Sequence, residues 1–152
     1  MFISNQINIM DTSGHIIQTG TAEELYNNPN NSYVTEFFGE TNKFEGIVSN
    51  SFVDTPLGKI KAPDNLENKK VQVHIRPKGI KLNEQPTPVN GIKGTVMASK
   101  LIGSFSFIHL SVLDKNNEVI HIHSHMPPNF NPKQSSAVEI EIDQSETYMF
   151  QS

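Results

Sequence analysis

The stretch that decides the fold is residues 71–77, which read V-Q-V-H-I-R-P. Its apolar side chains Val71, Val73 and Ile75 recur at every second position. In an extended chain such residues share one face, and the polar residues between them share the other. Pro77 cannot donate a backbone hydrogen bond and should end the strand. We therefore expect a half-buried strand that ends at the I-R-P tripeptide.

The same period of two recurs from residue 42 to the C-terminus. A polar loop at 83–90 and Pro-, Gly- or Asn-containing turns separate the repeats. Further strands are predicted at 44–53, 57–61, 92–100, 105–113, 118–125, 138–142 and 148–150. About seven short strands with regular turns are typical of a small β-sandwich or β-barrel. The predicted fold class is mainly β.

Residues 1–41 have a different character. A pair of short strands at 6–10 and 15–19 precedes T-A-E-E, a capping box that begins at Thr21. Helices are predicted at 22–28 and 32–38. Residues 1–42 carry five acids and no Lys or Arg, whereas residues 43–152 carry 12 basic and 11 acidic residues. This shift predicts two segments, 1–41 and 42–152.

Composition limits the possible functions. The chain has no cysteine, which excludes disulfides and Cys-based metal sites or nucleophiles. Its net charge of 12 − 16 = −4 disfavours nucleic acid as a partner. No run approaches the roughly 18 apolar residues that a membrane-spanning helix needs, so we expect no direct insertion into a membrane.

Several motifs together resemble one family. Residues 18–29, Q-T-G-T-A-E-E-L-Y-N-N-P, resemble the exit from the nucleotide-binding domain in ATP-binding subunits of bacterial ABC importers. Downstream, Ile75-Arg76-Pro77 resembles the I-R-P signature of the same family, and Gly103-Ser104 resembles its Leu-Gly-Ser motif. Two positions depart from the pattern: Ala22 replaces the usual Pro, and Lys78 replaces the usual acid after I-R-P.

The resemblance implies a domain assignment and a role. Residues 1–41 would be the C-terminal α/β remnant of the ATPase domain with a helical linker. Residues 42–152 would be a TOBE domain, an oligonucleotide-binding-like β-barrel that regulates and dimerises the subunit. The implied partners are a second copy and a membrane permease. The implied location is the cytoplasmic side of the inner membrane, reached through the permease.

The transported solute is less constrained by the resemblance. The motifs are similar to those of iron(III), polyamine and sugar importers, with iron(III) or polyamine favoured. The alternative function is a sensor domain that binds a small oxyanion or metal ion.

The chain is not predicted to be an enzyme. A P-loop requires G-x-x-x-x-G-K-[ST], and the Gly58-Lys59 pair is followed by Ile60. The sequence also contains no signature loop and no apolar strand that ends in Asp-Glu. In the family, the P-loop, the signature loop and this strand lie upstream of the segment that resembles this chain. We expect no cofactor in this chain, whereas a full-length parent would use ATP and magnesium.

The 105–113 strand supplies a candidate dimer interface. Ile108, Leu110 and Val112 should face the core, which leaves Phe105, Phe107 and His109 on the opposite face. Exposed aromatic side chains are enriched at interfaces. The alternative is a core large enough to bury both faces.

For Arg76, the favoured interpretation is structural: a guanidinium at a strand end that holds a carbonyl or carboxylate.

His121, His123 and His125 lie at alternate positions and should share a strand face. Imidazoles in this arrangement could bind zinc, nickel or copper. A third imidazole would reach the ion only if the strand bends. The alternative is a solvent-exposed strand with no ligand.

Overall fold

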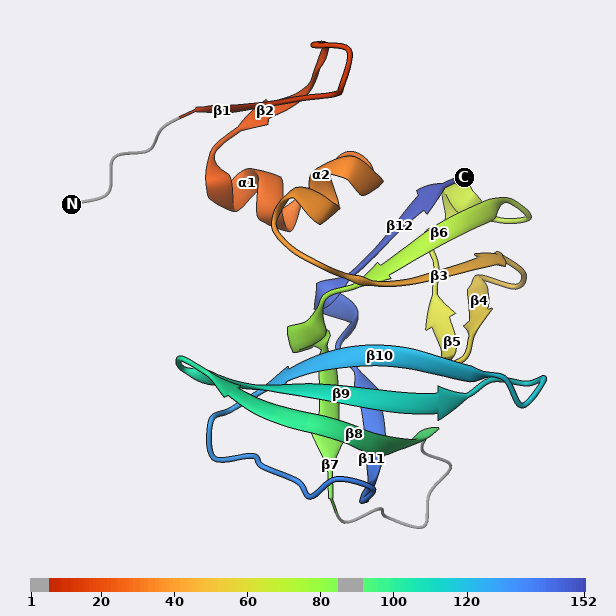
Figure 1. The fold of residues 1–152 in the computed structure, drawn as a ribbon. Coiled ribbons are helices and arrows are strands. Elements are labelled where there is room, and N and C mark those ends of the chain that lie inside the picture. The colour runs from red at the N-terminus through yellow and green to blue at the C-terminus, as the bar shows by residue number, and fades with distance from the viewer. Residues whose placement is uncertain (1–5, 85–91) are drawn as a thin grey trace. The chain divides into compact units, whose positions relative to one another are not determined.

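The computed structural model describes residues 6–84 and 92–152, and most of the predicted loop at 83–90 lies outside them. The chain divides into two compact units, Met1–Thr41 and Asn42–Ser152 (Figure 1). Both α-helices are six residues long, so within the described part of the chain no helix could cross a membrane.

The N-terminal unit is a strand pair followed by two short helices. Its elements are β1 (Ile7–Met10), β2 (Ile16–Gly20), α1 (Ala22–Asn27) and α2 (Ser32–Phe37). The Thr21 hydroxyl accepts a hydrogen bond from the backbone N–H of Glu24 at 3.2 Å, which confirms the predicted helix start. Ile9, Leu25 and Val34 form a small core. These elements agree with the predicted order of strands and helices.

The C-terminal unit consists of strands joined by turns and short 3-10 helices. Its strands are β3 (Asn42–Ile47), β4 (Phe52–Thr55), β5 (Gly58–Lys61), β6 (Lys70–Ile75), β7 (Ile80–Asn83), β8 (Ile92–Ile102), β9 (Phe105–Leu113), β10 (Val119–Met126), β11 (Ala137–Ile142) and β12 (Thr147–Gln151). Its 3-10 helices are η1 (Asp64–Leu66), η2 (Pro77–Gly79) and η3 (Gln144–Glu146). The predicted mainly β fold class, preceded by a short α/β segment, is confirmed.

The strands of this unit form one large and two small antiparallel sheets. The five-stranded sheet has the order β10-β9-β8-β11-β7, the three-stranded sheet β12-β6-β3, and β4 pairs with β5. Figure 1 shows β8, β9 and β10 side by side. One core runs through these sheets and includes Val73, Ile75, Ile80, Ile108 and Leu110.

The single strand predicted at 44–53 is wrong, because the chain turns between β3 and β4. Asn50 and Ser51 have positive φ angles of 53° and 67°. Their backbone N–H groups donate to the two carboxylate oxygens of Glu67, at 2.7 and 3.0 Å. A distant carboxylate thus stabilises the turn, and the local alternation pattern does not reveal it.

The prediction of a half-buried β6 is also wrong. Val71, Val73 and Ile75 are fully buried as expected, but His74 is fully buried as well, and Arg76 is 3% exposed. On the second face of β6 the His74 ring lies against the ring of Phe150 on β12, with ring centres 5.9 Å apart. A buried imidazole at 74 is compatible with this position because its Nε2 contacts the side-chain oxygen of Gln72 at 3.2 Å.

Candidate functional site

The I-R-P motif lies where β6 ends and the chain turns into β7. Ile75 is fully buried, and Pro77 is the first residue of η2. The backbone N–H of Arg76 donates to the carbonyl of Glu146 at 3.1 Å, and the backbone N–H of Gly79 donates to the carbonyl of Arg76 at 2.8 Å. The motif therefore joins β6 to the segment that leads into β12.

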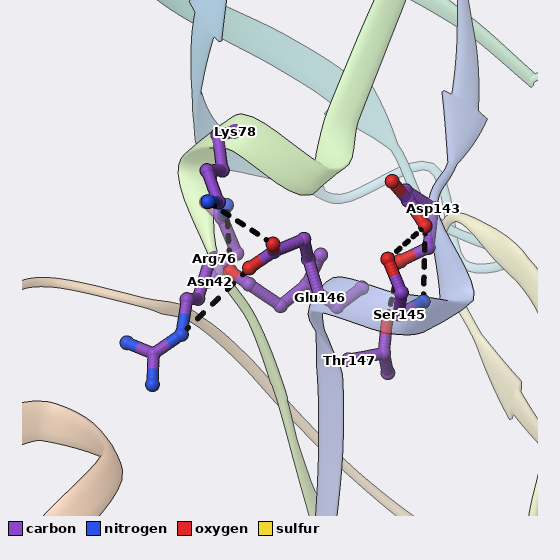
Figure 2. Close-up of polar contacts among 8 residues, drawn as sticks. Asn42, Arg76, Lys78, Asp143, Ser145, Glu146 and Thr147 are labelled. Carbon is purple, nitrogen blue, oxygen red and sulfur yellow. Dashed lines mark hydrogen bonds and ion pairs between the residues drawn. The ribbon is translucent and has the colours of Figure 1, made fainter. Parts of the chain in front are cut away.

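The Glu146 carboxylate lies between two cations of this motif (Figure 2). Its Oε2 is 3.9 Å from Nε of Arg76, and its Oε1 is 3.2 Å from Nζ of Lys78. The Arg76 guanidinium also lies over the ring of Tyr148, 5.0 Å from the ring centre. The expected structural environment of Arg76, with a carboxylate close to a strand end, agrees with this geometry.

Gly79 leaves room for η3 beside the motif, and Asp143 caps the start of η3. A Cβ atom at Gly79 would lie only 2.7 Å from Cβ of Glu146, so no larger residue fits there without a shift. Asp143 accepts hydrogen bonds from the hydroxyl and the backbone N–H of Ser145, at 2.6 and 3.0 Å (Figure 2). These bonds, the hydroxyl one first, lower the pKa of Asp143. All of these contacts fix the backbone.

Gly103 and Ser104 form the tight turn between β8 and β9. Gly103 has φ +56°, a conformation that a residue with a Cβ adopts at a cost. Ser104 is exposed. The positive φ of Gly103 indicates a role in the geometry of this turn.

The β9 strand alternates as predicted. Ile108, Leu110 and Val112 are at most 3% exposed and belong to the core. Phe105, Phe107 and His109 lie on the other face and are half-buried. The alternative of a core that buries both faces equally is not observed in the single chain.

The second face of β9 continues across the hairpin into β10, whose own alternate residues are histidines. The Phe105 ring stacks on His125 with centres 4.2 Å apart, and Phe107 stacks on His123 at 5.0 Å. His109 contacts His123 and His121, with ring centres 4.9 and 5.0 Å apart. We call these six side chains the ring row: Phe105, Phe107, His109, His121, His123 and His125.

The predicted histidine set thus lies on one face, but its ring contacts run across the hairpin to β9. The shortest polar contact of the row joins Nε2 of His109 to Nδ1 of His121 at 3.0 Å. In the described residues no group of three or more His, Asp or Glu side chains is arranged to hold a metal ion. Metal binding by His121, His123 and His125 therefore stays a prediction.

Burial lowers the pKa of His109, and the neighbouring His123 and His121 lower it further. Burial, followed by His123, also lowers the pKa of His125. The packing thus favours the neutral form of His109 and His125, and a neutral imidazole can accept a hydrogen bond or bind a metal ion.

Sequence reasoning missed Asn42, which connects the three-stranded sheet to the outer edge of β10. Its amide nitrogen donates to the carbonyls of Ile75 and His123 at 3.2 and 3.0 Å. Its amide oxygen accepts from the backbone N–H of His123 at 2.8 Å. No local pattern could reveal this contact, because the partners are 81 residues apart in the sequence.

Comparison with known proteins gives relatives of one kind, although no family model matches the chain. The spermidine/putrescine import ATP-binding protein PotA of Clostridium novyi is 33% identical over 119 residues, which are 76% of this chain and 32% of PotA. The Fe(3+) ions import ATP-binding protein FbpC of Streptomyces coelicolor is 32% identical over 64% of this chain and 27% of its own length. The putrescine transport ATP-binding protein PotG of Escherichia coli is 32% identical over 72% of this chain and 32% of its own length.

Among solved structures, the cytoplasmic molybdate-binding protein ModG overlaps 71% of this chain and 94% of its own chain. The TM-score is 0.43 and the sequence identity 11%, too low to assign a function.

The chain spans about a third of the length of these curated relatives: 32% of PotA, 27% of FbpC and 32% of PotG. The match lies in their C-terminal part. The resemblance predicted from the motifs is therefore confirmed: the chain is a homologue of the C-terminal part of the ATP-binding subunits of ABC importers.

Proposed function

We propose that residues 42–152 are the regulatory and dimerisation domain of an importer ATP-binding subunit. The ring row is the observation that supports this proposal best. It places two half-buried Phe rings and four imidazoles together on the outer face of the β9–β10 hairpin. Surfaces that combine aromatic rings with few charges are typical of the centre of protein interfaces.

The partner in this proposal is a second copy of the chain, bound through Phe105, Phe107 and His109. A contact of this kind would keep two ATPase domains close together after nucleotide leaves, because tethering raises their effective concentration. Regulation would follow if the contact differs between the open and closed states of the dimer.

The rest of the proposal comes from the relatives. Residues 1–41 would be the end of the ATPase domain, and a full-length parent would bind ATP and magnesium. It would work with a membrane permease at the cytoplasmic side of the inner membrane. The solute would be iron(III) or a polyamine, as for the relatives named for Fe(3+), putrescine and spermidine import, although relatives named for sulfate/thiosulfate import also match.

Light scattering coupled to size-exclusion chromatography tests the dimer. We expect the wild type to dimerise at tens of micromolar and Phe107→Ser to weaken the dimer about tenfold or more, as for an interface residue worth over 1 kcal/mol. Phe52→Ser is the matched control, because Phe52 is 42% exposed and lies on β4, outside the ring row. A monomeric wild type, or equal effects of the two variants, would refute the proposed interface.

The alternative function, a sensor for a small oxyanion or metal ion, is favoured by one observation, the close contact of His109 and His121. Calorimetry with candidate solutes separates the two functions, because a tether alone gives no heat of binding.

A further inference from the structure

The contact between His109 and His121 crosses diagonally from β9 to the neighbouring strand β10. His109 pairs in register with His123, and His121 pairs with Ser111. Even so, Nε2 of His109 and Nδ1 of His121 are only 3.0 Å apart. Both nitrogens belong to the outer face of the hairpin.

We propose that His109 and His121 are a two-imidazole ligand pair for a divalent transition metal ion, with copper(II) as the best fit. Metal–imidazole bonds are about 2.0–2.1 Å long. Two such bonds to nitrogens 3.0 Å apart enclose an angle of about 91–97° at the metal. This is the angle between neighbouring positions of a square-planar or tetragonal ion, the geometry of copper(II) and nickel(II).

The two ring nitrogens face each other at a hydrogen-bond distance, so binding of any metal ion requires the rings to turn. Copper is preferred to zinc because it stands higher in the usual order of affinities.

The surroundings of the pair suit an open, solvent-accessible site. His121 is exposed and His109 is half-buried, so water can reach the metal and complete its coordination. The His123 ring contacts His109 with centres 4.9 Å apart and restricts the orientation of that imidazole. Since no third ligand is arranged in the described part of the chain, the protein supplies two nitrogens.

The competing explanation is a hydrogen bond between two neutral imidazoles, in which one nitrogen donates and the other accepts. Metal binding requires both contacting nitrogens to be unprotonated, so the shared proton moves to the second nitrogen of the donor ring. The two rings then stay neutral, with their protons on Nδ1 of His109 and Nε2 of His121. Both ligands belong to one chain, but a dimer formed through Phe105, Phe107 and His109 would cover His109, so the metal site is proposed for the monomer.

The test is a titration of the full chain, free of any affinity tag, with copper(II). We expect one bound ion per chain, and His109→Gln and His121→Gln should each weaken binding tenfold or more. His125→Gln is the matched control, because His125 lies on the same face of β10 but contacts Phe105 and Phe107. Electron paramagnetic resonance should show coupling to two imidazole nitrogens in the wild type and to one in His121→Gln.

Equal affinities of the wild type and His121→Gln would overturn the proposal. So would an effect of His125→Gln as large as that of His121→Gln, which would instead favour the three-histidine set on β10. His121 is exposed, so His121→Gln should leave the fold intact. This variant therefore tests the proposal even if His109→Gln unfolds.

Discussion

Replacing Glu146 by Gln should destabilise the C-terminal unit, because this carboxylate lies beside two cations at the end of β6. The Arg76 side chain is 4% exposed and the Glu146 side chain 16%. Their ion pair is therefore poorly screened by solvent. Lys78, which contacts the other carboxylate oxygen, is 54% exposed.

The magnitude follows from these distances and exposures. Two unit charges 3.9 Å apart attract by about 4 kcal/mol at an effective dielectric constant of 20. Removing one partner of a buried pair costs about 3–5 kcal/mol. Arg76 keeps its contact with the Tyr148 ring, so we expect a smaller loss of about 2–3 kcal/mol for Glu146→Gln. The exposed Lys78 contact should contribute only about 0–1 kcal/mol.

Urea unfolding followed by circular dichroism measures both changes. With a slope of about 1–3 kcal/mol per molar, Glu146→Gln should lower the midpoint by roughly 1 M or more. Lys78→Gln is the control and should lower it much less. If the two variants lose the same stability, the contact with buried Arg76 is not what makes Glu146 important, and the structural interpretation of the I-R-P motif fails.

Two further predictions concern nucleotide and pH. The purified chain should show no ATPase activity and no affinity for Mg-ATP in a fluorescence assay, since the printed sequence contains no P-loop; micromolar binding would contradict this. The pKa of His125 is lowered from 6.5 in the folded state. As the pH falls below about 6.5, the unfolded state therefore binds a proton that the folded state does not, and the folded state loses stability. In the presence of a chelator, His125→Gln should therefore lose less stability than the wild type between about pH 7.5 and pH 5, and parallel losses would count against the burial of this imidazole.

The sequence predicts the fold well wherever the information is local. Alternation located β9 and its buried face, and the capping box at Thr21 located the start of α1. Gly103 marked its turn because few residues other than glycine adopt a positive φ. Local patterns failed at 44–53, where a remote carboxylate stabilises the turn, and at β6, where a ring distant in the sequence packs on the second face.

The candidate site shows the same limit. Each half of the ring row is visible in the sequence, as Phe105, Phe107 and His109 on β9 and three histidines on β10. What the sequence does not contain is the register, which places His123 opposite His109 and brings His121 to His109. A shift of pairing by two residues would keep every side chain on its face and yet separate the pair. The strand face of each residue could be predicted individually, but the contacts between the residues across the hairpin could not.

Lys78 illustrates how the structure changes the meaning of a departure from a family motif. In the family motif that this stretch resembles, an acid usually follows I-R-P. If that acid pairs with a second subunit, Lys78 would change the pairing. In the structure, however, Lys78 reaches Glu146 of its own chain at 3.2 Å, and the same carboxylate lies beside Arg76. The reversed charge is thus accommodated within one chain by the segment before β12. We therefore expect that the dimer, if it forms through the ring row, does not depend on Lys78.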